Sequence, residues 1–233
     1  AIHRIVDNVA ISLYNINTYS YSMRLAEKGD FIDEFRSTRS DECVSPSYAL
    51  LHGLAADGGL YVPESFPEKV LSYKELAGKS YQEIAEAVLS HFFTNFTAEE
   101  RKQMIASAYN DMTFRDDRIV PLHSIDTDLS IAELFHGRTL AFKDLALSLF
   151  PYLLTAAKKQ EKEDRDILIL TATSGDTGKA ALEGFKDVPG TNIMVFYPSE
   201  GVSPMQKQQM QKQEGNNVKV SAIYGISMTP RAF

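Results

Sequence analysis

The sequence has no tryptophan, a single cysteine and only five histidines. Cys43 alone cannot form an intrachain disulfide, so a disulfide framework and a cysteine-rich metal site are excluded. The histidines do not stand three or four positions apart, which is the spacing of metal-ligand pairs on a helix. We therefore expect neither a disulfide framework nor a metal site.

Excess positive charge and long apolar runs are also missing. The 24 basic residues are outnumbered by 31 acidic ones, which gives a net charge of -7 and disfavours a nucleic-acid partner. The longest apolar run, from Leu145 to Leu154, is short and contains Ser148 and Pro151, so we expect no membrane partner. Residues 1–30 lack the apolar core of a signal peptide, and cytoplasm is the expected compartment. Nothing indicates the oligomeric state.

The second half of the chain alternates between apolar strands and helical segments. Strands are predicted at Ile167–Leu170, Ile193–Tyr197 and Val218–Ile223, and helices at Gly178–Phe185 and Ser203–Gln213. Strands that are separated by single helices form βαβ units, and βαβ units build a parallel sheet. The expected fold class is therefore α/β.

Upstream of these units, the pattern predicts further helices. They cover Ser80–Asn95, Thr97–Tyr109 and Asp144–Gln160, and Thr97-Ala-Glu-Glu100 is a capping-box signature. Pro151 should either kink the third helix or mark its real first turn. Between Leu51 and Pro67 we expect the end of a helix, a glycine turn and a short strand.

Lys143 lies between an apolar run and an amphipathic segment, in Glu133-Leu-Phe-His-Gly-Arg-Thr-Leu-Ala-Phe-Lys-Asp144. A lysine on an apolar stretch is costly to desolvate, which favours a neutral amine able to form a Schiff base. If a helix starts at Asp144, the positive end of its dipole also opposes the ammonium form of Lys143. The alternative is an ordinary solvated lysine at a helix edge.

A second polar segment, Thr171-Ala-Thr-Ser-Gly-Asp-Thr-Gly178, follows the first predicted strand. It fits neither a phosphate-binding P-loop nor a dinucleotide fingerprint. Its hydroxyls and glycines before a helix suit a small carboxylate or phosphate. Alternatively, Ser174 or Asp176 simply caps that helix.

Two other features have equally open interpretations. Asp57-Gly58-Gly59 is either a functional segment or a turn that needs positive φ. His136, close to Lys143, either orients a substrate or is a buried structural histidine.

Taken together, five segments resemble threonine synthase, a pyridoxal-phosphate (PLP) enzyme of the tryptophan-synthase-β-like fold. The segments are Arg36-Ser-Thr-Arg39, Gly53 to Pro63, Glu133 to Asp144, Thr171 to Phe185, and Val195 to Pro204 with Gln206 and Met210. The resemblance implies a tail at 1–36, a small N-terminal α/β domain at 37–118, and the first part of an incomplete PLP-dependent catalytic domain at 119–233, with a parallel sheet.

The resemblance also assigns roles to residues. It implies that Lys143 is the catalytic lysine that forms a Schiff base with PLP and that Asp176 faces the 3'-oxygen of the cofactor ring. Ser174, Gly175, Thr177 and Gly178 are then the substrate-binding residues, with donors for the substrate carboxylate. The implied reaction is that of a carbon–oxygen lyase, which converts O-phospho-L-homoserine and water into L-threonine and phosphate. In it, Lys143 moves protons at the α and β carbons.

The chain departs from the resemblance in three places. Arg138 stands where proline or a small residue is usual, which leaves its effect on a substrate phosphate open. The glycine-rich loop for the PLP phosphate and the group at the pyridine nitrogen are expected beyond this sequence, so we expect weak PLP binding and an inactive chain. Ile226-Ser-Met-Thr-Pro-Arg-Ala-Phe233 replaces the usual Asn-Phe-Asp-Asp-Ala-Gln, and one deleted nucleotide would convert the second into the first. We hypothesise a frameshift at Ile226, which resequencing of the gene would test.

Two other functions remain open from the sequence. One is another PLP-dependent eliminase, such as a threonine or serine dehydratase, which the Asp57-Gly-Gly-Leu-Tyr-Val-Pro63 segment disfavours. The other is a non-catalytic relic or binding module, since a sheet with an exposed edge tends to pair with another chain.

Overall fold

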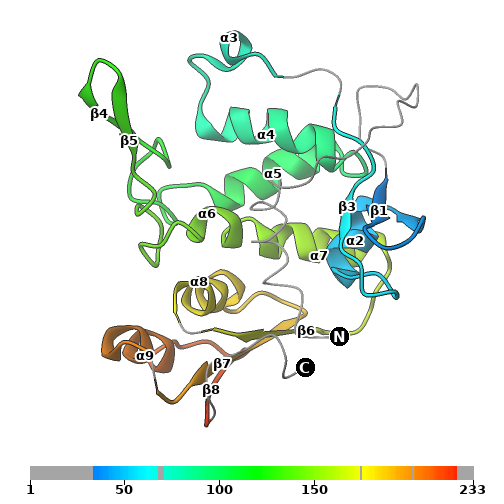
Figure 1. Ribbon diagram of the computed structural model, residues 1–233, viewed down its shortest axis with the longest axis vertical. Coiled ribbons are helices and arrows are strands. Elements are labelled where there is room, and N and C mark those ends of the chain that lie inside the picture. The colour runs from blue at the N-terminus through cyan, green and yellow to red at the C-terminus, as the bar shows by residue number, and fades with distance from the viewer. Residues whose placement is uncertain (1–33, 68–70, 174, 201, 225–233) are drawn as a thin grey trace.

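The computed structural model describes residues 34–67, 71–173, 175–200 and 202–224. The segments 1–33 and 225–233, which include most of the expected tail and the hypothesised frameshift, lie outside the described residues, as does Ser174. Figure 1 shows the sheet from residues 167–223 at one end of the molecule, with helices layered on it. The sheet from residues 35–63 lies to one side. Within the described ranges, no helix is long and apolar enough to cross a membrane.

The first described residues form an antiparallel sheet with strand order β2-β1-β3. Its strands are β1 (Phe35–Ser37), β2 (Cys43–Val44) and β3 (Tyr61–Pro63), and helix α2 (Pro46–His52) lies between β2 and β3 in the chain. Helix α2 ends at Gly53, which has φ +64°. The helix end, glycine turn and short strand predicted between Leu51 and Pro67 are therefore confirmed. Strand β1 begins before residue 37, where the sequence predicts the first domain to start.

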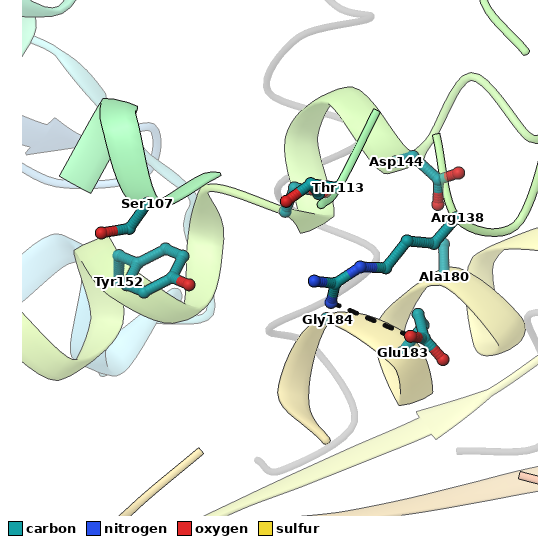
Figure 2. Close-up of a pocket in the computed structure, with 9 residues that line it drawn as sticks. Ser107, Thr113, Arg138, Asp144, Tyr152, Ala180, Glu183 and Gly184 are labelled. Carbon is teal, nitrogen blue, oxygen red and sulfur yellow. Dashed lines mark ion pairs between the residues drawn. The ribbon is translucent and has the colours of Figure 1, made fainter. Parts of the chain in front are cut away.

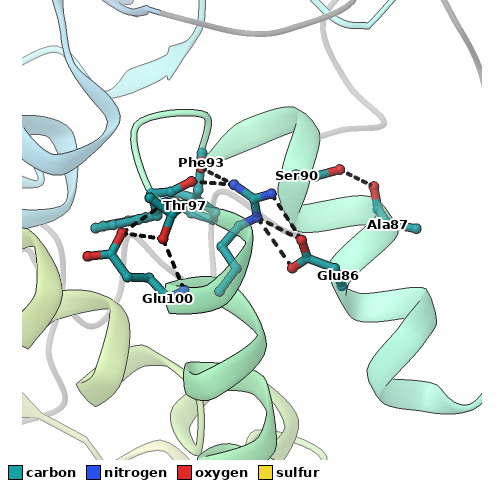
Figure 3. A network of polar contacts seen from close by, with 8 residues as sticks. Glu86, Ala87, Ser90, Phe93, Thr97 and Glu100 are labelled. Carbon is teal, nitrogen blue, oxygen red and sulfur yellow. Dashed lines mark hydrogen bonds and ion pairs between the residues drawn. The ribbon is translucent and has the colours of Figure 1, made fainter.

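After the short helix α3 (Tyr73–Leu76), two longer helices follow, α4 (Tyr81–Phe92) and α5 (Ala98–Ala108). The predicted capping box of α5 is present, because Glu100 N donates to Thr97 Oγ1 and Thr97 N donates to Glu100 Oε2. Arg101 is buried and bonds Glu86 of α4 and the carbonyl of Phe93 (Figure 3). This arginine therefore fixes α5 against the end of α4.

A hairpin of β4 (Leu122–Asp126) and β5 (Leu129–Ala132) projects from one side of the molecule (Figure 1). Every residue of the two strands is exposed. No pattern in the sequence predicted this hairpin. Its apolar residues Leu122, Leu129 and Ile131 are each at least half exposed.

The segment predicted as one helix at Asp144–Gln160 is two helices, α6 (Asp144–Leu147) and α7 (Phe150–Gln160). Pro151 lies in the first turn of α7, where the missing N–H of proline costs no helical hydrogen bond. Of the two alternatives for Pro151, the real first turn is confirmed.

The three predicted strands form a parallel sheet in the order β6-β7-β8. They are β6 (Ile167–Ala172), β7 (Thr191–Pro198) and β8 (Val218–Ile223), connected by helices α8 (Asp176–Phe185) and α9 (Pro204–Gln211). Alternate β7 residues such as Ile193 and Val195 are buried in a core with Phe185 of α8 and Met210 of α9. The predicted α/β class with a parallel sheet is confirmed.

Helix α7 contributes to two apolar cores, one around the parallel sheet and one around α5. Leu154 joins the core around the parallel sheet, whereas Leu149, Leu153 and Ala157 pack with α5 residues such as Ile105. Complete burial of one leucine contributes about 1.5–3 kcal/mol, so the helix couples the two parts strongly. The site segments are thus held on a common scaffold.

Candidate active site

Lys143 lies directly before α6, as the sequence analysis expected. Its side chain is half-buried, and its ammonium lies 5.1 Å from the centroid of the Phe142 ring. No carboxylate forms an ion pair with it among residues 34–67, 71–173, 175–200 and 202–224. Because α6 is a single turn, the helix dipole beside Lys143 is smaller than that of the longer predicted helix.

The turn before Lys143 is fixed by the next residue, Asp144. The backbone N–H of Thr139 donates to Asp144 Oδ2 at 2.8 Å, and the Thr139 hydroxyl donates to Oδ1 at 2.7 Å. Asp144 is only 4% exposed, and burial raises the pKa of its carboxyl above the usual value. A side chain at Gly137 would overlap Asp144, so the residue there must be small. Asp144 therefore closes residues 137–144 into a compact turn.

The polar loop lies at the carboxyl end of β6. Thr171 and Thr173 are buried, and the Thr171 hydroxyl has no hydrogen-bond partner among the described residues. Gly175 precedes α8, and its N–H donates to Thr173 Oγ1 at 3.2 Å. The exposed Asp176 accepts a hydrogen bond from Gln206 Nε2 of α9 at 3.2 Å. Ser174, predicted to bind the substrate, lies outside the described residues.

Among the described residues, which do not include Ser174, no side chain caps the start of helix α8. The alternative in which Asp176 merely caps this helix is therefore wrong, because Asp176 is the first helical residue and bonds α9 instead. A Cβ at Gly178 would overlap the Thr173 methyl group and lie 3.1 Å from Val195 Cγ1, so α8 starts close against β6 and β7. Its first N–H groups thus stand at the carboxyl edge of a parallel sheet, where ligands commonly bind.

The two predicted site segments meet through α6 and α8. A side-chain atom at Gly184 of α8 would overlap the carbonyl oxygen of Leu147 in α6, so the helix backbones are in contact. Beside this contact is a small, partly open hollow (Figure 2). Its lining residues are Ser107, Thr113, Arg138, Asp144, Ser148, Tyr152, Ala180, Glu183 and Gly184. Lys143, Gly175, Asp176, Thr177 and Gly178 do not line it, so the hollow is separate from the predicted reaction site.

Several residues around the site were not singled out from the sequence. Thr139 and Asp144 position the turn, and Glu183 pairs with Arg138 across the hollow at 3.8 Å. A sequence signal existed for Asp144, which is an acid within an apolar stretch. For Glu183 there was none, since a glutamate on a helix is ordinarily solvated.

His136 interacts with a carboxylate, since its Nε2 lies 2.7 Å from Glu133 Oε2. Its ring stacks on Phe135, and its carbonyl accepts the N–H of Arg115. These contacts favour the structural interpretation of His136. Among the residues that the structure describes, no group of three or more histidine, cysteine or acidic side chains is arranged to hold a metal.

Comparison with known proteins gives one consistent result. The family model "Threonine synthase N terminus" matches residues 34–109. Threonine synthase from Saccharomyces cerevisiae is 35% identical over 207 residues, which is 82% of this chain and 40% of the relative. The enzyme from Pseudomonas aeruginosa is 40% identical over 182 residues, which is 76% of this chain and 37% of the relative.

Solved structures extend the match to the fold. The crystal structure of yeast threonine synthase has a TM-score of 0.74 at 32% identity and covers 83% of this chain and 41% of its own. The PLP-bound threonine synthase from Brucella melitensis has a TM-score of 0.73 at 40% identity, covering 82% and 41%. The chain thus spans about 40% of the length of these threonine synthases. Over the matched residues, the chain is similar to threonine synthases in both sequence and fold.

Proposed function

We propose that this chain contributes the catalytic lysine and the substrate loop of a threonine synthase, which converts O-phospho-L-homoserine and water into L-threonine and phosphate with PLP as cofactor. The observation that carries the proposal is the 35–40% identity to threonine synthases, together with a TM-score of 0.74. The division into an N-terminal domain at 37–118 and the first part of a catalytic domain at 119–233 belongs to the same proposal.

The residues at the carboxyl edge of β6 fit such a cofactor and substrate. The start of α8, which no described side chain caps, presents N–H donors that suit a carboxylate. Gly178 lets that helix start close to the strand end, and the buried Thr171 hydroxyl there has no hydrogen-bond partner among the described residues. The amine of Lys143 lies directly before α6, and the backbone of α6 contacts α8. Lys143, the proposed nucleophile, and the proposed anion site at the start of α8 therefore lie on neighbouring parts of the fold.

In this proposal, each residue has a separate role. Lys143 holds the cofactor and moves protons at the α and β carbons of the substrate, which a half-buried amine can do once it is neutral. Gly175, Thr177 and Gly178, with Ser174, bind the substrate carboxylate at the start of α8. Asp176, which Gln206 orients, would hold PLP on the side of its 3'-oxygen. When bound, PLP supplies an electron sink for the negative charge that develops on the substrate.

PLP binding at Lys143 tests the proposal more directly than turnover, since the chain spans about 40% of the relatives' length. The purified chain is mixed with PLP, its visible absorbance is recorded, and borohydride reduction followed by peptide mass spectrometry locates the modified lysine. We expect modification of Lys143 that is lost in Lys143→Ala. Lys158→Ala is the matched control, because Lys158 is also half-buried but pairs with Asp166 at 3.9 Å.

Substrate selectivity separates this proposal from the dehydratase alternative. O-phospho-L-homoserine should change the absorbance of the PLP-loaded chain, whereas L-serine and L-threonine should have weaker effects. A larger response to L-serine would favour the dehydratase. An unmodified Lys143 at saturating PLP would contradict the proposed role of this residue and favour a non-catalytic relic.

A further inference from the structure

The guanidinium of Arg138 crosses from the turn before α6 to helix α8 (Figure 2). Its Nη1 lies 3.8 Å from Oε1 of Glu183, and the Arg138 side chain is 44% exposed. The guanidinium of Arg138 therefore faces the carboxylate of Glu183. This pairing offsets the positive charge that would otherwise attract a substrate phosphate. Arg138 is better placed to hold two elements together than to bind phosphate.

Glu183 in turn contacts two further segments. Its Oε2 accepts a hydrogen bond from Gln213 Nε2 at 2.9 Å and lies 3.9 Å from the ammonium of Lys179. The Lys179 ammonium also donates to Gln213 Oε1, and burial lowers the pKa of Lys179. Glu183 is thus held in place by α8 and by the segment after α9, so it is a fixed partner for Arg138.

Arg138 belongs to the turn that ends at Asp144. Asp144 binds Thr139 within the turn, but these hydrogen bonds do not connect the turn to α8. The ion pair of Arg138 with Glu183 supplies such a connection through side chains, and the contact of Gly184 with Leu147 supplies one through the backbone. Lys143 lies five positions after Arg138, inside the segment that these contacts hold.

We propose that Arg138 is a positioning residue, which fixes the turn bearing Lys143 against the helix bearing Gly175 to Gly178 by pairing with Glu183. This role rests on the proposed function, because only there do Lys143 and the start of α8 act on the same molecule. An ion pair with this exposure changes an equilibrium by up to about fivefold, so the expected effects are modest and measurable.

Two measurements on the purified chain test the role. The first is amide hydrogen exchange in residues 137–144, which needs no cofactor and should be two- to about fivefold faster in Arg138→Gln. The second is the fraction of Lys143 modified at subsaturating PLP, which should fall by a similar factor. Arg138→Lys keeps the charge and should restore both values to within about twofold of the wild type, and Glu183→Gln should act like Arg138→Gln.

Arg165→Gln is the control, because it removes an arginine that pairs with Glu163 and is 87% exposed. It should change neither measurement. Equal exchange and equal Lys143 modification in Arg138→Gln and the wild type would overturn the positioning role, as would failure of Arg138→Lys to restore them. If wild-type Lys143 is not modified by PLP, the proposed function fails, and the positioning role that rests on it falls as well. Faster exchange in Arg138→Gln would then show only that the pair holds the turn.

Discussion

Gly184 of α8 faces the backbone carbonyl of Leu147 in α6 so closely that a side-chain atom at Gly184 would overlap it. This contact brings together the helix that follows Lys143 and the helix that begins beside Gly175. The distance between the segment that bears Lys143 and the segment Gly175–Gly178 therefore depends on residue 184 having no side chain.

We predict that Gly184→Ala destabilises the chain by about 1–3 kcal/mol, because the added methyl group must push α6 and α8 apart. Alanine is favoured over glycine in a helix by about 1 kcal/mol, so a smaller loss would mean that the helices adjust easily. Urea unfolding followed by circular dichroism measures the difference. Gln209→Ala, at an exposed position of α9, is the control and should stay within about 0.5 kcal/mol.

Arg101 is the second position where one change should have a large effect. Its guanidinium is 2.9 Å from Glu86 Oε1 and bonds the carbonyls of Phe93 and Phe96 (Figure 3). Arg101→Met leaves Glu86 and two carbonyls without this partner, and we expect a loss of about 3–5 kcal/mol. Arg118→Met removes a more exposed arginine that pairs with Asp116, and should cost less than about 1 kcal/mol in the same urea titration. Similar losses for both variants would contradict this account.

The parallel sheet could be predicted because its strands carry their signals locally. Apolar runs such as Ile167–Leu170 and Ile193–Tyr197 are bounded by polar residues or proline, and Pro204 fits the first turn of α9. Lys143 and the Gly175–Gly178 loop could also be singled out, since an apolar context and a glycine-rich loop are visible in the sequence.

The contacts between segments could not be predicted. The pair of Arg138 with Glu183 joins two surface-type residues whose proximity depends on how α6 packs on α8. The β4–β5 hairpin was missed because its side chains are exposed on both strands, so no burial pattern marks them. The sequence signal for a hairpin turn was limited to the two residues Thr127 and Asp128, which separate two short segments that contain apolar residues.

The buried carboxyl of Asp144 should make stability depend on pH. Burial raises its pKa in the folded chain above the ordinary value of about 4. Its contribution to stability is therefore full below the unfolded pKa and is lost as the pH rises through the folded pKa. We predict that the advantage of the wild type over Asp144→Asn shrinks as the pH is raised from just below 4 through the folded pKa. Urea titrations at several pH values measure it, and an advantage that grows with pH would refute the assignment.

The start of α8 offers a test in which one substitution should correct another. A methyl group at Gly178 would overlap Cγ2 of Thr173, so Gly178→Ala should destabilise the chain by about 1–3 kcal/mol and displace the loop from Thr173 to Gly178. Thr173→Ser removes Cγ2 but keeps the hydroxyl that accepts the Gly175 N–H. The double variant should therefore recover most of the stability, with a coupling free energy of about 1 kcal/mol or more in a double-mutant cycle. Additive losses would mean that Val195, 3.1 Å from the added atom, is the limiting contact instead of Thr173.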